Sequence, residues 1–180
     1  MKIIALSDMH GHLPRVPQCD VCLIAGDSCP VSSHKPEYQA RWLDTEFREW
    51  LQTIPSKLTI GIAGNHDLIF SSDHNNGVSV PDGLRWEFLQ DSGIEFDGLK
   101  FWGTPYQAEF NGWPFMRSTE WLQEHWANLP AMDVWLSHGP PLGYLDDVDG
   151  APAGMIALRE KLELMQPQLC VTGHIHENFG

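Results

Sequence analysis

Short apolar segments alternate along this chain with longer segments of helical character, and this alternation constrains the fold more than any other feature. Residues 36–54 carry apolar side chains at near-helical spacing, and Pro55 ends that segment. Residues 155–165 form a second helical segment, which Pro167 ends. The apolar segments that are short enough to be strands are residues 2–6, 21–25, 58–63, 134–136 and 169–172. This order predicts an α/β layer architecture in which at least some strands are parallel.

Local signals refine this outline in the middle of the chain. Residues 94–96 and 99–102 are expected to pair as antiparallel strands, because Asp97-Gly98 is a preferred sequence for a two-residue turn. Residues 71–83 are polar, which predicts a loop, and Ser118 is expected to cap a short helix. The sequence contains neither a repeat nor a linker, so one domain is expected to cover all 180 residues.

The composition argues against two classes of protein. A formal net charge of −13 is unfavourable for binding a nucleic-acid polymer, since such proteins need a basic face. No segment has the apolar length of a transmembrane helix, and the apolar run at residues 3–6 is too short for a signal peptide. We therefore expect a cytoplasmic protein without a membrane partner. Cys19 and Cys22 form a single C-x-x-C pair, where buried thiols are expected rather than a zinc ribbon.

A polar cluster follows each of the five apolar segments predicted to be strands, at the point where the strand ends. These clusters are Asp8-Met9-His10, Gly26-Asp27, Gly64-Asn65-His66-Asp67, Ser137-His138-Gly139 and Gly173-His174-Ile175-His176. In open α/β sheets, ligands bind beyond the carboxyl ends of the strands. The clusters are therefore expected to converge on one site, although they are spread over most of the chain.

The side chains in these clusters are types that bind metal ions. Asp8 and His10 lie two residues apart, and in an extended segment that spacing points both side chains to the same side. His174 and His176 repeat the spacing with two imidazoles, and Asp27 has two carboxylate oxygens that can bridge two ions. Each cluster alone is a common pattern. Their joint occurrence in this order predicts a metal site.

The ordered set D-x-H, G-D, G-N-H-D, H-G and G-H-x-H resembles the signature of the calcineurin-like metallophosphoesterase superfamily, from Asp8 to His176. The segments Ser-His-Gly-Pro-Pro-Leu-Gly at 137–143 and Phe-Asn-Gly-Trp at 110–113 are similar to those of the small MPPED-type metallophosphoesterase-domain phosphodiesterases. The resemblance implies an α/β fold with four layers, an α/β/β/α sandwich around two central sheets.

The resemblance also implies further strands after the G-H-x-H motif, which complete the two sheets. This sequence stops at Gly180, four residues after His176. We therefore expect an exposed sheet edge. Either the C-terminal strands are missing from this edge, or a partner chain covers it. A second copy of the chain, in a homo-oligomer, is one candidate partner.

A centre of two divalent transition-metal ions that share Asp27 is implied as well. Manganese is expected, and the imidazole, carboxylate and amide donors also suit iron, zinc, cobalt or nickel better than calcium. Some MPPED-type proteins carry glycine at the position of His174, so the histidine here predicts a complete second site. The implied ligands are Asp8, His10, Asp27 and His176 for one ion, and Asp27, Asn65, His138 and His174 for the other.

The activity implied by the resemblance is hydrolysis of small phosphodiesters, cyclic nucleotides among them, by a hydroxide that bridges the two ions. His66 is the candidate general acid for the leaving group, and Asp67 either orients His66 or is a turn residue before a helix. Three other functions stay open: a broad-specificity phosphomonoesterase, a weakly catalytic nucleotide-binding protein and an interaction protein.

Aromatic side chains gather in residues 106–115, and two of them are candidates to contact a small phosphoester or nucleotide substrate. Phe110 and Trp113 can stack on a nucleobase, with Asn65 and His66 completing the predicted contacts. An alternative is that these rings only cover the edge of the core. The histidines expected to lie at the surface, away from the site, are His34, His74 and His125.

Overall fold

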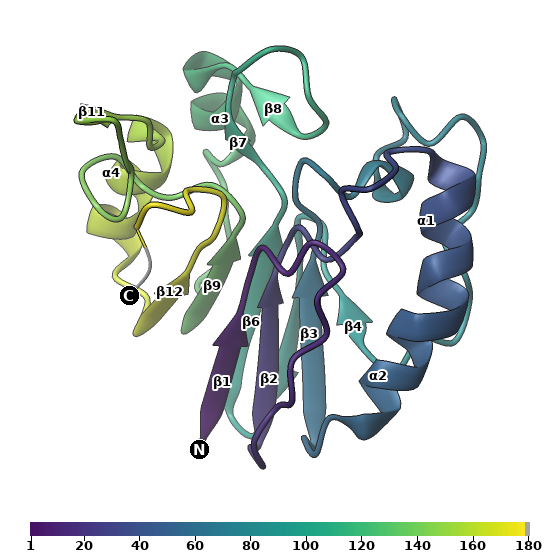
Figure 1. The fold of residues 1–180 in the computed structure, drawn as a ribbon. Coiled ribbons are helices and arrows are strands. Elements are labelled where there is room, and N and C mark those ends of the chain that lie inside the picture. The colour runs from purple at the N-terminus through teal and green to yellow at the C-terminus, as the bar shows by residue number, and fades with distance from the viewer. Residues whose placement is uncertain (179–180) are drawn as a thin grey trace.

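The computed structural model describes residues 1–178 and contains two four-stranded sheets that pack face to face (Figure 1). In spatial order, the first sheet consists of β1 (Ile3–Leu6), β2 (Val21–Ala25), β3 (Leu58–Ile62) and β4 (Glu87–Phe88). The second sheet consists of β12 (Leu169–Val171), β9 (Val134–Ser137), β6 (Leu99–Thr104) and β5 (Ser92–Phe96). All neighbours are parallel except β5 and β6, which form the expected hairpin. Two-stranded ribbons that the sequence did not predict are β7 (Gln107–Ala108) with β8 (Met116–Arg117), and β10 (Asp147–Val148) with β11 (Ala151–Pro152).

Helices cover the outer faces of both sheets (Figure 1). On the first sheet, α1 (Pro36–Trp42) continues through a π-helical turn, Leu43–Phe47, into α2 (Arg48–Thr53), which confirms the predicted helical segment. On the second sheet lie α3 (Thr119–His125) and α4 (Ile156–Met165). Among the described residues, no helix has both the length and the apolar character that a membrane crossing requires.

The apolar core is divided between the layers by the alternation of side chains along each strand. All five residues of β2 are buried. Val21 and Leu23 belong to the core between the two sheets, whereas Ile24 packs in the core beneath α1 and α2. In β9, Trp135 points outward and lies edge-to-face with Trp126, with 5.5 Å between ring centroids. The four-layer α/β/β/α sandwich expected from the resemblance is therefore confirmed.

Two local predictions are confirmed at atomic detail. Asp97 and Gly98 both have positive φ values, 50° and 78°, as a tight turn between twisted strands requires. The Ser118 hydroxyl accepts a hydrogen bond from the backbone N–H of Trp121 at 3.3 Å, which caps α3.

Strands β1 and β12 are the outer strands of their sheets among the described residues. Because β2 lies against β9 and β3 against β6, these two outer strands border the same side of the sandwich. Within residues 1–178, neither of these two strands pairs with a further strand on its outer side. Association of the chain through this edge stays a prediction.

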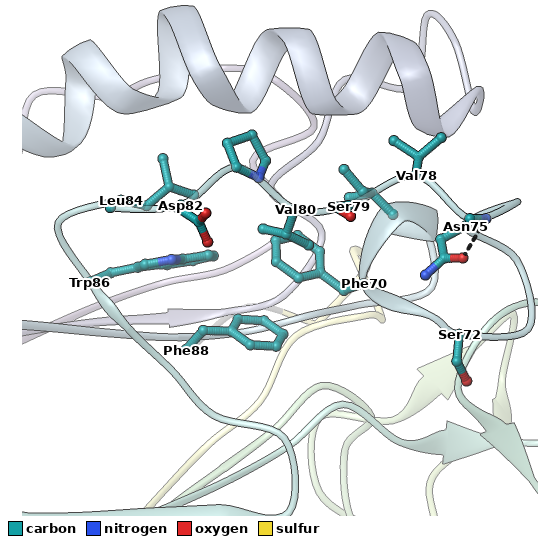
Figure 2. A pocket seen from close by; sticks show the side chains of 14 residues that line it. Phe70, Ser72, Asn75, Val78, Ser79, Val80, Asp82, Leu84, Trp86 and Phe88 are labelled. Atoms are coloured by element: carbon teal, nitrogen blue, oxygen red, sulfur yellow. Dashed lines mark hydrogen bonds between the residues drawn. The ribbon is translucent and has the colours of Figure 1, made fainter.

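A groove of about 590 Å³ lies near β4, where the polar loop predicted at 71–83 forms part of its wall. Figure 2 shows the rings of Phe70, Trp86 and Phe88 along this groove, and the Phe70 and Phe88 rings are stacked with 4.4 Å between their centroids. Arg48 of α2 donates hydrogen bonds to the backbone carbonyls of Asp82 and Gly83, which holds the loop against the helix. None of the predicted metal ligands lines this groove.

The assignment of side chains to the layers of the core predicts that two leucine-to-alanine substitutions differ strongly in their effect on the free energy of unfolding. Leu23→Ala removes a fully buried side chain between the sheets and is expected to lower the free energy of unfolding by about 2–5 kcal/mol. Leu164→Ala is the matched control, because Leu164 is 75% exposed. Urea denaturation of both variants measures the difference. Equal stability of the two would contradict the assignment of Leu23 to the inter-sheet core.

Candidate metal centre

The five polar clusters meet at one end of the sandwich. Backbone hydrogen bonds connect the loops within each sheet: Asp8 donates its N–H to the carbonyl of Gly26 at 3.0 Å, and Gly173 donates to the carbonyl of His138 at 2.9 Å. A third contact joins the two sheets, where Nδ1 of His138 lies 2.9 Å from the carbonyl oxygen of Ala25. The expected convergence at the carboxyl ends of the strands is therefore present in the structure.

Left-handed backbone conformations direct several of these side chains inward. The residues with positive φ are Asp8 (51°), His10 (48°), Asp27 (52°) and His174 (73°). Such conformations cost about 1–3 kcal/mol each at residues other than glycine, and they concentrate at functional sites. The extended segment expected at residues 8–10 is therefore wrong. Asp8 and His10 approach each other through a turn and not through strand alternation.

Two glycines in the cluster motifs permit close approach of the ligands. A Cβ atom at Gly64 would lie 2.2 Å from Oδ1 of Asp27 and 2.5 Å from Cε1 of His138. A Cβ atom at Gly26 would lie 2.5 Å from Nδ1 of His138, and the φ of Gly26 is +93°. Any side chain at either position would separate Asp27 from His138, so the G-D and G-N-H-D motifs need their glycines for packing.

One group of donor atoms contains Asp8, His10 and His176. Their ligand atoms lie within 4.8 Å of one another. Nε2 of His10 is 3.1 Å from Nε2 of His176, and Nε2 of His176 is 3.4 Å from Oδ1 of Asp8. Two imidazole nitrogens that face each other at this distance repel unless a proton or a cation lies between them. Two imidazoles beside a carboxylate are ligands that suit a divalent cation.

A second group lies deeper, around His138. Nδ1 of His138 faces the carbonyl oxygen of Ala25, which can only accept a hydrogen bond, so Nδ1 carries a hydrogen. Nε2 is the ring nitrogen that faces Asn65 and Asp27. Nε2 lies 3.2 Å from Oδ1 of Asn65 and 3.4 Å from Oδ2 of Asp27. Nδ1 of His174 is 2.9 Å from the same amide oxygen. Ligand atoms of Asp8, Asp27 and His138 also lie within 4.8 Å of one another, so the two groups are adjacent.

The charges of this cluster favour a bound cation. Burial disfavours the protonated form of His138, but the carboxylates of Asp27 and Asp8 outweigh it and raise the pKa of His138 to about 9. Burial and the nearby His138 lower the pKa of His174 to about 4. Burial raises the pKa of Asp27, yet His138 and the N–H of His66 outweigh this and hold it below its usual range. The site therefore keeps the carboxylate of Asp27 charged and attracts a positive charge, which a metal ion can supply in place of a proton.

The loop that carries His66 and Asp67 is fixed by buried hydrogen bonds. Both carboxylate oxygens of Asp67 accept backbone N–H groups, from Ser28 (3.2 Å), Cys29 (2.7 Å) and Gly64 (2.9 Å). Of the two roles left open for Asp67, these contacts support the turn residue, which precedes the 3₁₀-helix Leu68–Phe70. The carboxylate of Asp67 binds backbone N–H groups, and among the described residues it forms no hydrogen bond with the His66 ring. These contacts therefore do not support a role for Asp67 in orienting that ring.

His34 is the ring partner of His66. Nε2 of His34 lies 2.9 Å from Nδ1 of His66, and both rings are partly buried. The expectation that His34 is a surface histidine away from the site is therefore wrong. The pairing spans 32 residues of sequence, and the only local signal was the position of His34 just before Pro36, which begins α1.

The two predicted substrate contacts differ in their surroundings. The Trp113 ring is 4.8 Å from the His66 ring, between centroids, so it borders the candidate site. Phe110 is 64% exposed, and its backbone N–H faces Sδ of Met116. Contact of Asn65, His66, Phe110 and Trp113 with a substrate stays a prediction.

The cysteines of the C-x-x-C pair are free and buried, as expected.

Comparison with known proteins identifies the family. The family described as calcineurin-like phosphoesterase matches residues 1–178, which include every candidate ligand. The chain belongs to this family. Calcineurin-like phosphoesterases are hydrolases that act on phosphoric esters with divalent metal ions. The donor set of two carboxylates, one amide and four imidazoles fits such ions.

Similar curated proteins include MPPED-type members of the calcineurin-like phosphoesterases. UPF0046 protein K07C11.7 of Caenorhabditis elegans is 34% identical over 196 residues, which cover 100% of this chain and 65% of that protein. Metallophosphoesterase domain-containing protein 1 of Homo sapiens is 30% identical over 207 residues, which cover 99% of this chain and 61% of that protein. The chain thus spans less than two thirds of the length of these relatives.

Solved structures share the fold at low sequence identity. One aligns with a TM-score of 0.64 and 14% identity, over 99% of this chain and 85% of the other. TT1561 of Thermus thermophilus aligns with a TM-score of 0.54 and 12% identity, over 94% of this chain and 80% of the other. These similarities support the α/β sandwich of the family.

Metal binding is expected to release protons. With the pKa of His138 at about 9 in the ion-free protein, an ion that binds its Nε2 must displace a proton, so the affinity for Mn²⁺ is expected to rise from about pH 6 to about pH 9. Calorimetric titration in buffers of different ionisation enthalpy measures the released protons. His74→Ala should behave as the wild type, whereas His138→Gln should lose this proton. Binding without any proton release would contradict the assignment of His138.

Substitution of Asp67 is expected to affect stability. In Asp67→Asn, one carbonyl oxygen and an NH₂ group replace two acceptors of buried N–H groups, so the free energy of unfolding should fall by about 1–3 kcal/mol. Asp44→Asn removes a carboxylate from an exposed pair with Arg48 and is the control. Thermal denaturation compares the two. A wild-type melting temperature for Asp67→Asn would show that the buried N–H groups do not need the carboxylate.

Proposed function

We propose that this chain is a dinuclear metal-dependent phosphodiesterase that hydrolyses small phosphodiesters, cyclic nucleotides among them. The observation that carries the proposal is the arrangement of donors around Asp27. Ligand atoms of Asp8, the buried Asp27 and His138 lie within 4.8 Å of one another, and Asp8 also belongs to the group with His10 and His176, so the two groups of donors adjoin beside Asp27. A pair of ions bridged by a carboxylate is the arrangement used for in-line displacement at phosphorus.

Each candidate ligand has a defined place in the proposed centre. Asp27 would bind both ions. When bound, the ions would supply positive charge to the phosphoryl group and activate water as the nucleophile. The remaining ligands would be Asp8, His10 and His176 on the more exposed side, and Asn65, His138 and His174 on the buried side. Manganese, iron, zinc, cobalt and nickel all suit these donors, with manganese proposed as the first ion to test.

His66 is the proposed general acid. Its backbone N–H donates to Oδ1 of Asp27 at 2.7 Å, which places the ring beside the ligands without making it one. Among the described residues, no hydrogen bond engages Nε2 of His66, so this atom can donate a proton to a leaving alkoxide. Burial, the largest effect on His66, lowers its pKa, which eases release of that proton.

Trp113 supports a substrate with a flat organic group. Its ring lies beside His66 and is partly exposed, so an aromatic or nucleobase substituent can pack there while the phosphate faces the ions. The chain's net charge of −13 favours a small substrate over a nucleic-acid polymer. A phosphomonoesterase would use the same ligands, so the test must compare both ester types.

Purified protein loaded with Mn²⁺ is expected to hydrolyse bis(4-nitrophenyl) phosphate faster than 4-nitrophenyl phosphate. Chelation should abolish both activities, and Mn²⁺ should restore them. Asp27→Asn is expected to lower kcat/KM by about 100-fold or more, because both ions lose a charged ligand. Asp44→Asn, on the exposed face of the helix, serves as the control.

The outcomes separate the candidate functions. Faster hydrolysis of the monoester would favour a phosphomonoesterase, and nucleotide binding without hydrolysis would favour a binding protein. Hydrolysis that persists in Asp27→Asn would contradict the role of Asp27 as the ligand shared by two ions.

A further inference from the structure

His66 is held by contacts on four sides. Asp27 accepts its backbone N–H, and the side chain of Gln39 donates to its backbone carbonyl at 2.7 Å. Nδ1 faces Nε2 of His34 at 2.9 Å. The ring of Trp113 packs against both imidazoles, with centroid distances of 4.8 Å to His66 and 5.3 Å to His34. Only Nε2 remains without a hydrogen-bond partner among the described residues.

Two of these contacts come from one segment, residues 34–39, at the start of α1. Gln39 is fully buried, and its carboxamide also accepts the backbone N–H of Ile69 at 3.0 Å. It therefore spans the loop from His66 to Ile69 and fixes the backbone of that loop to the helix. His34 lies five residues earlier, just before the first turn, and reaches the ring of His66. One short segment thus fixes both the main chain and the side chain of the same residue.

Orientation by His34 determines which nitrogen of His66 faces the site. An imidazole turned about its χ2 torsion exchanges its nitrogen and carbon edges, and a hydrogen bond to one nitrogen selects a single orientation. With Nδ1 engaged by His34, Nε2 is the nitrogen that stays available. The carboxylate that could have done this, Asp67, is occupied by three backbone N–H groups.

We infer that His34 is a positioning residue, which orients His66 for proton donation to the leaving group. The inference rests on the proposed phosphoesterase function and adds a residue to its machinery. Among the described residues, the ring of His34 contacts His66 and Trp113 and forms no hydrogen bond with a candidate ligand, so it acts through His66. Its loss should impair protonation of the leaving group and leave metal binding intact.

The leaving group provides the test. A 4-nitrophenolate leaves as a stable anion, whereas a phenolate is more basic and benefits more from protonation. His34→Ala is expected to lower kcat for diphenyl phosphate by about 10–100-fold and for bis(4-nitrophenyl) phosphate by less than about 3-fold, with KM little changed for both. His34→Gln keeps a polar group near the position of Nε2 and should recover part of the loss.

Two further variants complete the design. His34→Ala combined with His66→Ala should be no slower than His66→Ala alone, because both substitutions disable one function. His74→Ala is the matched control: His74 also pairs through a ring nitrogen, with the Ser71 hydroxyl at 3.0 Å, but it lies outside the cluster around His66.

Each result has a defined meaning. Equal losses on the two diesters, or kinetics like those of His74→Ala, would overturn the positioning role while leaving the phosphoesterase proposal in place. A metal-loaded wild-type protein that hydrolyses neither diester would overturn the proposed function, and the role of His34 with it.

Discussion

The buried carboxylate of Asp27 is the constraint on which the rest of the site depends. It is 1% exposed, and a charge removed from water in this way is costly unless donors or cations surround it. The N–H of His66 meets one oxygen, and His138 faces the other. The positive charge that this carboxylate needs is what makes the cluster a candidate cation site, and Gly26 and Gly64 give the space in which it forms.

The sandwich brings the other ligands to this carboxylate. Parallel strands in each sheet end at the same edge, so residues from the start and the end of the sequence meet, as Asp8 and His176 do. Left-handed turns at the strand ends then direct the side chains inward. The strain in these turns is offset by the large apolar core between the layers, an exchange that is common at functional sites. The packed layers thus stabilise the protein, and the turns at the strand ends carry the side chains of the site.

Much of this could be predicted from the sequence because it depends on local patterns. Alternation of apolar segments predicted the main strands, and the D-x-H and G-H-x-H motifs marked the places where strands end. The short ribbons could not be predicted, because two-residue strands have no periodicity. The left-handed turn at Asp8 has no sequence signal either. The extended conformation predicted there was wrong, but the two side chains that it paired do lie in one cluster.

The neighbours of His66 show where local reasoning ends. His34 and His66 lie 32 residues apart, and only the packing of α1 against the 3₁₀-helix Leu68–Phe70 brings their rings together. For Asp67, proximity in sequence suggested a partnership with His66, but three buried backbone N–H groups compete for the same carboxylate and occupy it. The fold determines which backbone N–H and C=O groups are buried and must find a hydrogen-bond partner, and no sequence motif indicates which ones these are.

A crystal structure of the protein soaked in Mn²⁺, with anomalous scattering data, tests the central claim most directly. We expect two anomalous peaks about 3.5–4 Å apart, with Asp27 between them. A single peak, or peaks at surface carboxylates away from Asp27, would contradict a dinuclear centre in this protein.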